Sequence, residues 1–492
     1  GPPTPGPARL QAAPLVQSGD ATSSSAVVWA KATGAHAERG GRLVVDVTGV
    51  DDPGFARARR FTGPAATPET DFTAQLALRD LPAGAPLLYR AGFGEPTPAG
   101  MTVGRTRTAA VDDRELRFVW SGDTVGQGWG IDPARGGLAA YGAMRALAPD
   151  FFVHVGDMIY ADSPLVAEVP LDDGTVWRNL VTPAKQRVAE TLDDFRGCFA
   201  YPFLCAEFQR FAREVPLYAI WDDHEVFNDW WPGAVRDDAR ATEQRADVLA
   251  RHALRAMREY VPLRPSARLY RSVRWGAGAE LFFLDGRSYR SPDGENLEPE
   301  GSAFWGDEQL AWLTRGLTTS TATWKVVATD MPLGLVLPHT AATERGRATQ
   351  EGFGQSDGPP LGRERELARL LSACRAAGVH NLLFLTADVH YAAVHRFTPE
   401  RAFFKDFNTF HECVAGPLHA SSFPPKRTDG TFGPEVLFQV AEPVASGSGP
   451  HQDRQSFGVV HVARGTHALT VTLRSGRGAL LHEVTLQPRG PR

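Results

Sequence analysis

Two aspartates that follow short apolar runs are the residues in this sequence best placed to do chemistry. Asp123 comes just after the run Leu116–Trp120, and Asp157 ends a second such run. The helix-length interval through Ala139–Leu147 predicts that the two runs are parallel strands joined by a helical crossover. Ligands of open α/β sheets bind outside the carboxyl ends of the strands, so both carboxylates are expected at one rim. A single such aspartate is also typical of a cap or a turn, whereas two of them with Tyr160 nearby favour a metal site.

Later predicted strands also run into polar side chains. These strands are Leu217–Ile220, Glu280–Leu284, Trp324–Ala328 and Asn381–Leu385. The side chains that follow them are Asp223, His224, Asn228, Asp285, Arg287, Asp330, Asp388 and His390. Taken singly, His224 is explained equally well as a core histidine, Asp285 as a cap and Asp330 as a turn residue. Together they predict a cluster of oxygen and nitrogen donors, which suits hard or borderline divalent cations. At least two cations are needed to offset the repulsion among so many carboxylates.

Composition places the chain among globular proteins. It has 492 residues, of which 22% are charged and 42% hydrophobic, with a net charge of -5. This length allows two or three domains and a large core. The charge is small and no basic stripe occurs, so we predict no nucleic-acid-binding surface. No apolar run approaches the roughly 20 residues that a membrane-spanning helix needs.

The cysteines and the first residues carry little functional signal. The four cysteines are too few and too scattered for a zinc cage; they are Cys198, Cys205, Cys374 and Cys413. We expect buried free thiols, although Cys198 and Cys205 are close enough in sequence for a disulfide in an oxidising compartment. The stretch Gly1–Pro7 is read as a loose tail that follows either a removed export signal or a tag.

The elements that must position the predicted site fall into two parts. Between Ala13 and Arg107 short β-prone runs alternate with turn residues, which predicts an antiparallel β-sandwich acting as scaffold or lid. These runs are Ser24–Lys31, Arg42–Thr48, Asp71–Leu78 and Pro86–Phe93. From Glu115 onward strands alternate with helices, as in a layered α/β domain. The run Phe457–Ala463 and two further β-runs predict an edge meander. Two long loops, Pro338–Gly362 and Phe423–Phe457, are expected to shape substrate access.

The order of the motifs resembles a known family. The motifs are Ser-Gly-Asp123, Gly-Asp157-x-x-Tyr160, Trp-Asp-Asp223-His224-Glu225-x-x-Asn228 and Ala-Asp388-Val-His390. They are similar to those of the calcineurin-type metallophosphoesterases and most similar to those of the PhoD-like alkaline phosphatases. The resemblance implies a four-layer α/β sandwich over residues 113–492, preceded by a fibronectin- or Ig-like β-sandwich over residues 1–112. It also implies a secreted or periplasmic protein.

The same resemblance assigns roles to individual residues. Asp157 would bridge two metals. The coordination of the first metal, iron(III), would be completed by Asp123, Tyr160, Asp388 and His390. Asp223 and Asn228 would hold the second metal, calcium, with manganese, magnesium and zinc as alternatives. His224 would act as donor to the phosphate or to the leaving group. Arg287 would bind phosphate through a bidentate fork, or equally well form a structural salt bridge.

This sequence departs from the family pattern in three places. No cysteine lies near the first motif, where Asp123 stands. Ala-Asp388-Val-His390 replaces the wider superfamily's Gly-His-x-His. The usual histidine of the fourth motif is not visible and Asp330 occupies the corresponding region. The identities of both metals and the roles of Asp330 and His339 therefore stay open.

The predicted function is hydrolysis of phosphate esters by a metal-bound hydroxide. Two cations roughly 3.5–4 Å apart supply the nucleophile and neutralise the phosphoryl charge, and His224 assists the leaving oxygen. The expected substrates are small-molecule, lipid or nucleotide phosphate esters. A phosphodiesterase or phospholipase-type activity is the first alternative. A non-catalytic secreted β-sandwich protein that stores metal is the second.

Overall fold

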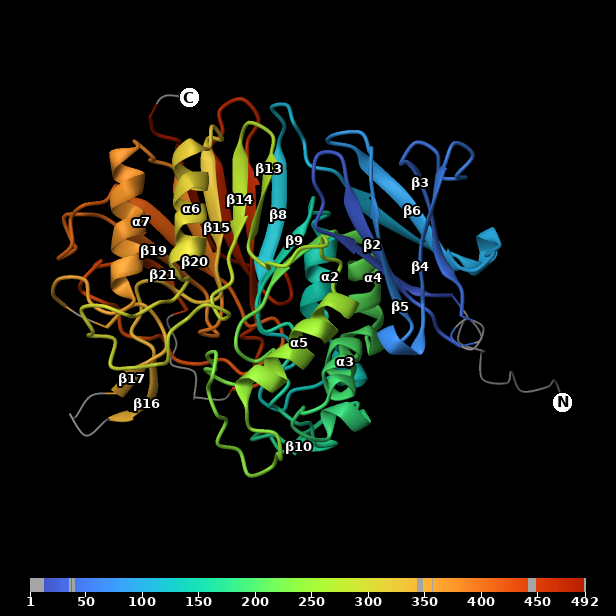
Figure 1. Cartoon of the computed structure of the whole chain (residues 1–492), viewed down its shortest axis with the longest axis horizontal. Coiled ribbons are helices and arrows are strands. Elements are labelled where there is room, and N and C mark those ends of the chain that lie inside the picture. The colour runs from blue at the N-terminus through green and yellow to red at the C-terminus, as the bar shows by residue number, and fades with distance from the viewer. Residues whose placement is uncertain are drawn as a thin grey trace.

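The computed structural model describes residues 13–34, 37, 40–342, 348–355, 357–440 and 448–490. The predicted tail Gly1–Pro7 lies outside these residues, as do residues 343–347, 356 and 441–447 of the two predicted loops. Figure 1 shows a β-sandwich on the N-terminal side packed beside a larger α/β part.

A nine-stranded sheet carries the first predicted strands. Its order is β24-β23-β22-β8-β9-β12-β1-β2-β5. Strands β8, β9 and β12 are parallel, and helix α2 forms the predicted crossover between the first two. The bounds are β8 (Leu116–Ser121), α2 (Ala139–Ala146), β9 (Phe152–Val155) and β12 (Leu217–Ile220). The predicted meander forms one edge, as β22 (Ser456–Val462), β23 (Leu469–Ser475) and β24 (Leu480–Leu486).

A seven-stranded sheet carries the later strands. Its order is β13-β14-β15-β18-β20-β19-β21, and β14, β15, β18 and β20 are parallel. The bounds are β13 (Arg271–Trp275), β14 (Ala279–Phe283), β15 (Trp324–Ala328), β18 (Leu382–Thr386), β19 (Ala393–Phe397), β20 (Phe410–Val414) and β21 (Glu435–Gln439).

The two sheets face each other, and helices cover their outer faces. In β8, Phe118 and Trp120 enter the core between the sheets while Val119 packs against the helices, because side chains alternate along a strand. The helices α2, α3, α4 and α5 cover the first sheet, and α6 and α7 stand over the second (Figure 1). Their bounds are α3 (Leu192–Ala200), α4 (Ala206–Glu214), α5 (Ala246–Tyr260), α6 (Asp307–Thr319) and α7 (Glu364–Ala376). The predicted four-layer architecture is confirmed.

The predicted N-terminal β-sandwich is also present, but its sheet continues into the α/β part. Strands β1, β2 and β5 pack against a four-stranded sheet of order β4-β3-β6-β7. Their bounds are β1 (Leu15–Gly19), β2 (Ala26–Lys31), β3 (Arg42–Gly49), β4 (Arg59–Ala65), β5 (Thr73–Leu78), β6 (Pro86–Phe93) and β7 (Thr102–Arg107). Strand β1 pairs in parallel with β12 through Gly19 and Leu217, so both parts share one sheet.

A buried ion pair reinforces this junction. Asp20 is fully buried; its carboxylate accepts from the backbone N–H of Arg264 at 2.7 Å and from Arg271 Nε at 2.6 Å. Burial opposes ionisation, but the two guanidinium groups lower the pKa of Asp20 below its usual value. The β-sandwich is thus held to the α/β part by charge as well as by backbone pairing.

The remaining elements are short. They are β10 (Glu168–Pro170), β11 (Val176–Arg178), β16 (Pro338–Ala342), β17 (Ala348–Gln350) and 3₁₀ helices at Pro68–Thr70, Pro98–Gly100, Pro133–Arg135, Pro183–Lys185, Tyr201–Leu204 and Pro450–Gln452. All four cysteines are buried free thiols, as expected. Among the described helices, none combines the length and apolar character needed to cross a membrane.

Candidate metal centre

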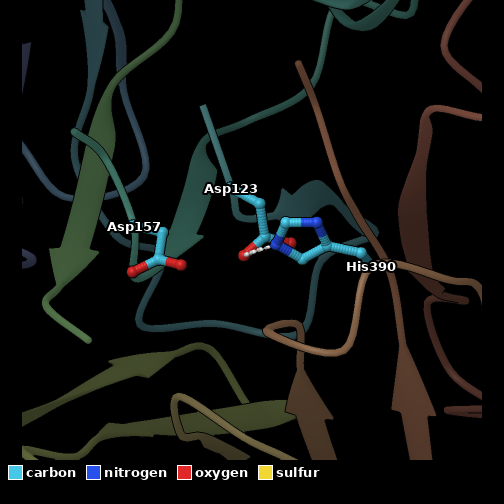
Figure 2. A group of neighbouring side chains, drawn as sticks. All are labelled: Asp123, Asp157 and His390. Atoms are coloured by element: carbon cyan, nitrogen blue, oxygen red, sulfur yellow. Dashed lines mark ion pairs between the residues drawn. The ribbon is translucent and has the colours of Figure 1, made fainter. Parts of the chain in front are cut away.

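Four of the predicted metal ligands lie just beyond strand ends in strained backbone conformations. Asp123 follows β8, Asp157 follows β9, and Asp388 and His390 follow β18; their φ angles are 65°, 53°, 68° and 60°. The left-handed region is uncommon for residues other than glycine, and such strain concentrates at functional sites. Figure 2 shows the Asp123 carboxylate between Asp157 and the His390 imidazole.

A glycine allows the strand ends to approach each other closely. Gly156 has a φ of 114°, and a Cβ at this position would lie 2.5 Å from the Cβ of Asp222. Only glycine can therefore bring the turn after β9 against the turn after β12. This contact places Asp157 beside Asp223, whose carboxylate shares with Asp157 the backbone N–H of His224 at 2.9 and 3.1 Å.

The first ligand group consists of Asp123, Asp157 and His390, whose donor atoms lie within 4.8 Å of one another. His390 Nδ1 contacts the carbonyl oxygen of Ser421, so this nitrogen carries the proton. The lone pair of Nε2 then faces Tyr160 Oη at 2.9 Å and Asp123 Oδ1 at 3.8 Å. Such a hydrogen bond on the far nitrogen is the usual way in which a protein orients a metal-binding histidine.

Three further groups extend along the rim from Asp157. They are Asp157 with Asp223 and His224, Asp222 with Asp223 and Asp388, and Asp223 with Asp229 and Glu351. Asp157 belongs to two of the four groups and Asp223 to three. These two carboxylates therefore link neighbouring positions at which cations could bind.

The electrostatics of the rim fit bound cations. Burial, together with neighbouring carboxylates, raises the pKa of Asp123, Asp157 and Asp388 well above the usual value. Among the described residues, buried Asp123 Oδ2 has no hydrogen-bond partner. Gly416 leaves room beside it, because a Cβ there would lie 2.4 Å from this oxygen. Carboxylate, imidazole and phenol donors without thiolate suit hard or borderline cations, so the residues fit the predicted group of metals.

His224 is held at the edge of the metal centre by a second carboxylate. Its Nδ1 lies 2.7 Å from Asp162 Oδ1, and its ring stacks on Tyr160 with centroids 4.3 Å apart. Burial would lower the pKa of His224, but the charges of Asp162 and Asp223 raise it to about 10. Asp162 therefore orients the imidazole.

Arg287 forms the structural salt bridges that were the alternative to its predicted phosphate contact. It is fully buried; Nε donates to Asp222 Oδ1 at 2.8 Å and Nη2 pairs with Glu351. Despite burial, Asp222 and Glu351 raise the pKa of Arg287. A phosphate-binding fork needs free N–H groups that face the substrate. These N–H groups are directed at carboxylates instead, so we treat Arg287 as a positioning residue.

Replacing Arg287 should destabilise the protein strongly. Arg287→Leu leaves the buried carboxylates of Asp222 and Glu351 without their cation, which typically costs about 3–5 kcal/mol. The free energy of unfolding is measured by denaturant titration of metal-free protein, so that bound cations do not compensate. Arg245→Leu, which removes an exposed partner of Glu243, is the matched control and should cost far less, because solvent screens an exposed ion pair. Equal losses in the two variants would contradict the buried role.

Comparison with known proteins identifies the family. The model of the PhoD-like phosphatase matches residues 118–473, and the model of the PhoD-like phosphatase N-terminal domain matches residues 5–110. The chain belongs to the PhoD-like phosphatase family. Alkaline phosphatase D of Bacillus subtilis (strain 168) is 29% identical over 275 residues, which are 52% of this chain and 43% of that relative. The match thus spans less than half the length of this relative.

Solved structures share the fold of this PhoD-like chain. A structure of PhoD aligns over 98% of this chain and 92% of its own, with a TM-score of 0.72 at 20% identity. A purple acid phosphatase from yellow lupin (Lupinus luteus) seeds aligns over 96% and 74%, with a TM-score of 0.58 at 13% identity. These likenesses confirm the predicted fold.

Two predicted residues, Asn228 and Asp285, belong to none of the four ligand groups. Asn228 is exposed; its backbone N–H donates to Asp162 at 2.8 Å, while the adjacent Asp229 joins a carboxylate group. Asp285 accepts from Trp221 Nε1 at 2.9 Å and from the backbone of Arg287 at 3.1 Å, as expected for a cap.

The two residues whose roles were open now have partners. Asp330 is fully buried and pairs with Arg290 at 3.4 Å. It therefore lies in a structural ion pair rather than in one of the ligand groups. His339 Nδ1 pairs with Asp229. It therefore supports the outermost carboxylate group of this PhoD-like site, which consists of Asp223, Asp229 and Glu351.

Sequence reasoning did not assign several residues that complete the PhoD-like centre. Glu225 accepts the backbone N–H groups of Asp157, Met158 and Asp222 at 3.2, 2.6 and 2.8 Å, and so ties two turns together. It stands within the quoted Asp-Asp-His-Glu motif, which was the available signal. Glu351 lies in a predicted loop and has no local signal, because its partners are distant in sequence.

Proposed function

We propose that this chain hydrolyses phosphate esters at the strand-end metal centre. The observation that supports the proposal is the chain of four ligand groups joined by Asp157 and Asp223. In this proposal Asp123, Asp157, Tyr160, Asp388 and His390 hold one cation. Asp223, with Asp157 and a neighbouring carboxylate or Asn228, holds a second. When bound, the cations neutralise phosphoryl charge and acidify water.

The chain's own residues would perform the remaining tasks. His224 carries a proton on an imidazole oriented by Asp162, and transfers it to the leaving oxygen as the ester bond breaks. Glu225 and Arg287 keep the carboxylates in place. The buried rim excludes bulk water, which strengthens these charge interactions. As part of the same proposal, iron(III) and calcium are the metals and the protein acts in a secreted or periplasmic setting.

An assay on two synthetic esters tests the proposal. Metal-loaded protein is incubated with 4-nitrophenyl phosphate, a monoester, and bis(4-nitrophenyl) phosphate, a diester. We expect turnover of the monoester, and loss of that turnover in His224→Ala by about 100-fold or more. Turnover of the diester alone would select the phosphodiesterase alternative. Turnover of neither would leave the non-catalytic metal-storing alternative.

Tyr160 distinguishes an iron-containing site from a site with only closed-shell cations. A phenolate bound to iron(III) gives a visible charge-transfer band, which calcium, magnesium and zinc cannot give. Tyr160 Oη lies 2.9 Å from His390 Nε2, inside the first ligand group. If iron-containing protein is coloured, Tyr160→Phe should remove or shift the band while circular dichroism stays unchanged. Persistence of the same band would exclude Tyr160 as the ligand.

A further inference from the structure

A pocket of about 370 Å³ lies beside the metal centre. Asp162, which orients His224, and Asp229, which belongs to the outermost carboxylate group, both line it. The pocket therefore begins at Asp162, next to His224. Its other walls come from the segment between β12 and α5, mainly residues 227–240.

One wall of this pocket is apolar. Phe227, Trp231, Ala234 and Val235 contribute to it, and Val235 is 71% exposed. An exposed valine beside a half-buried tryptophan offers surface to an apolar part of a ligand. Such a surface would contact the portion of a leaving alcohol that follows the ester oxygen.

Three of the four carboxylates that line the pocket have a cationic partner or a histidine beside them. Asp162 pairs with His224, Asp229 pairs with His339, and Asp238 pairs with Arg240 at 2.7 Å. The fourth carboxylate of the lining, Asp237, is exposed. Among the residues that line the pocket, one buried cationic side chain does not belong to any of these pairs.

That cation is Arg236, which is only 6% exposed. Nη2 donates to the carbonyl oxygen of Glu243 at 2.7 Å, whereas Nε and Nη1 have no hydrogen-bond partner among the described residues. Its guanidinium lies 5.8 Å from the ring centroid of Phe227, which offers it no hydrogen bond. Buried unsatisfied N–H groups on a charged side chain are costly, and an oxyanion is the ligand that satisfies two of them together.

We infer that this pocket is a leaving-group subsite for phosphate esters whose alcohol has an apolar body ending in a carboxylate, with Arg236 as the anion-binding residue. The inference rests on the proposed hydrolase function. The apolar wall would hold the body of the alcohol, and Arg236 would bind its terminal anion. Arg236 then determines specificity and takes no part in bond breaking.

Two aryl phosphates that differ only in charge test the subsite. 4-Carboxyphenyl phosphate carries the anion, and 4-carbamoylphenyl phosphate is its neutral counterpart. The measured quantity is the ratio of their kcat/KM values. We expect Arg236→Gln to lower this ratio by about tenfold or more, since a charge-assisted hydrogen bond is lost. Arg236→Lys should give an intermediate ratio. Arg245→Gln removes a nearby exposed guanidinium that does not line the pocket, and should leave the ratio unchanged.

Binding of the corresponding benzylphosphonates provides a readout without turnover. Calorimetry on wild-type, metal-loaded protein compares 4-carboxybenzylphosphonate with 4-carbamoylbenzylphosphonate, and tighter binding of the carboxylate is expected. Equal affinities, or no binding of either, would overturn the subsite, as would an unchanged kcat/KM ratio in Arg236→Gln. If neither aryl phosphate is hydrolysed, the hydrolase function fails, while the phosphonate comparison still decides the subsite. Because it uses wild-type protein, the phosphonate comparison also tests the subsite if Arg236→Gln does not fold.

Discussion

Removal of all metal should abolish hydrolysis of 4-nitrophenyl phosphate and lower the stability of the fold. The rim joins at least six carboxylates through Asp157 and Asp223, and burial already disfavours their charged forms. Cations that bind only the folded state stabilise it by about 4 kcal/mol at 1,000 times their dissociation constant. Activity and melting temperature are followed before and after chelation, with elemental analysis to confirm removal. Full activity in metal-free protein would refute the metallophosphatase proposal.

The metal-free protein should also respond to pH in a distinctive way. Because burial and neighbouring charges raise the pKa of Asp123, Asp157 and Asp388, the folded state binds more protons than the unfolded state. Stability then falls as pH rises above the unfolded-state pKa of these groups. After chelation, melting should occur at a higher temperature at about pH 5 than at about pH 7, a window that includes the pKa of about 7 to which burial raises Glu225 in the same rim. The opposite slope would show that these carboxylates do not dominate the electrostatics of the empty rim.

Asp157→Asn should lower kcat/KM by about 1,000-fold or more, equivalent to roughly 4 kcal/mol of transition-state stabilisation. Asp157 is the carboxylate shared by the group containing Asp123 and His390 and the group containing Asp223 and His224. A neutral amide keeps the shape of the side chain but not the charge that both groups need. Kinetics on 4-nitrophenyl phosphate and metal content per chain are measured together.

Asp285→Asn is the matched control for that substitution. Asp285 also follows a strand end and is buried, but its Oδ1 accepts from Trp221 and from two backbone N–H groups, and asparagine retains such an oxygen. A decrease of at most about tenfold is expected. Equal losses in the two variants, with metal content intact in both, would mean that Asp157 does not link the two groups.

The main strands and most of the candidate ligand positions were predictable from local patterns in the sequence. Short apolar runs bounded by polar residues, such as Leu116–Ser121 before Asp123, indicate buried strands, and the parallel arrangement brings strand ends to one rim. The order of the motifs was specific enough to indicate the family that the comparisons show. Residues adjacent in sequence to a strand end, including Asp157, Asp223 and His390, were therefore predictable.

The partners of individual side chains became known only from the tertiary structure. Arg287 has the same chemistry whether it binds phosphate or carboxylate, and only its burial against Asp222 and Glu351 separates the two roles. The contact of Asp162 with His224, and the Nε and Nη1 groups of Arg236 that lack a partner among the described residues, depend on how loops fold over the rim. Pairings of this kind join residues far apart in the chain, and their free energy depends on distances that local periodicity does not encode.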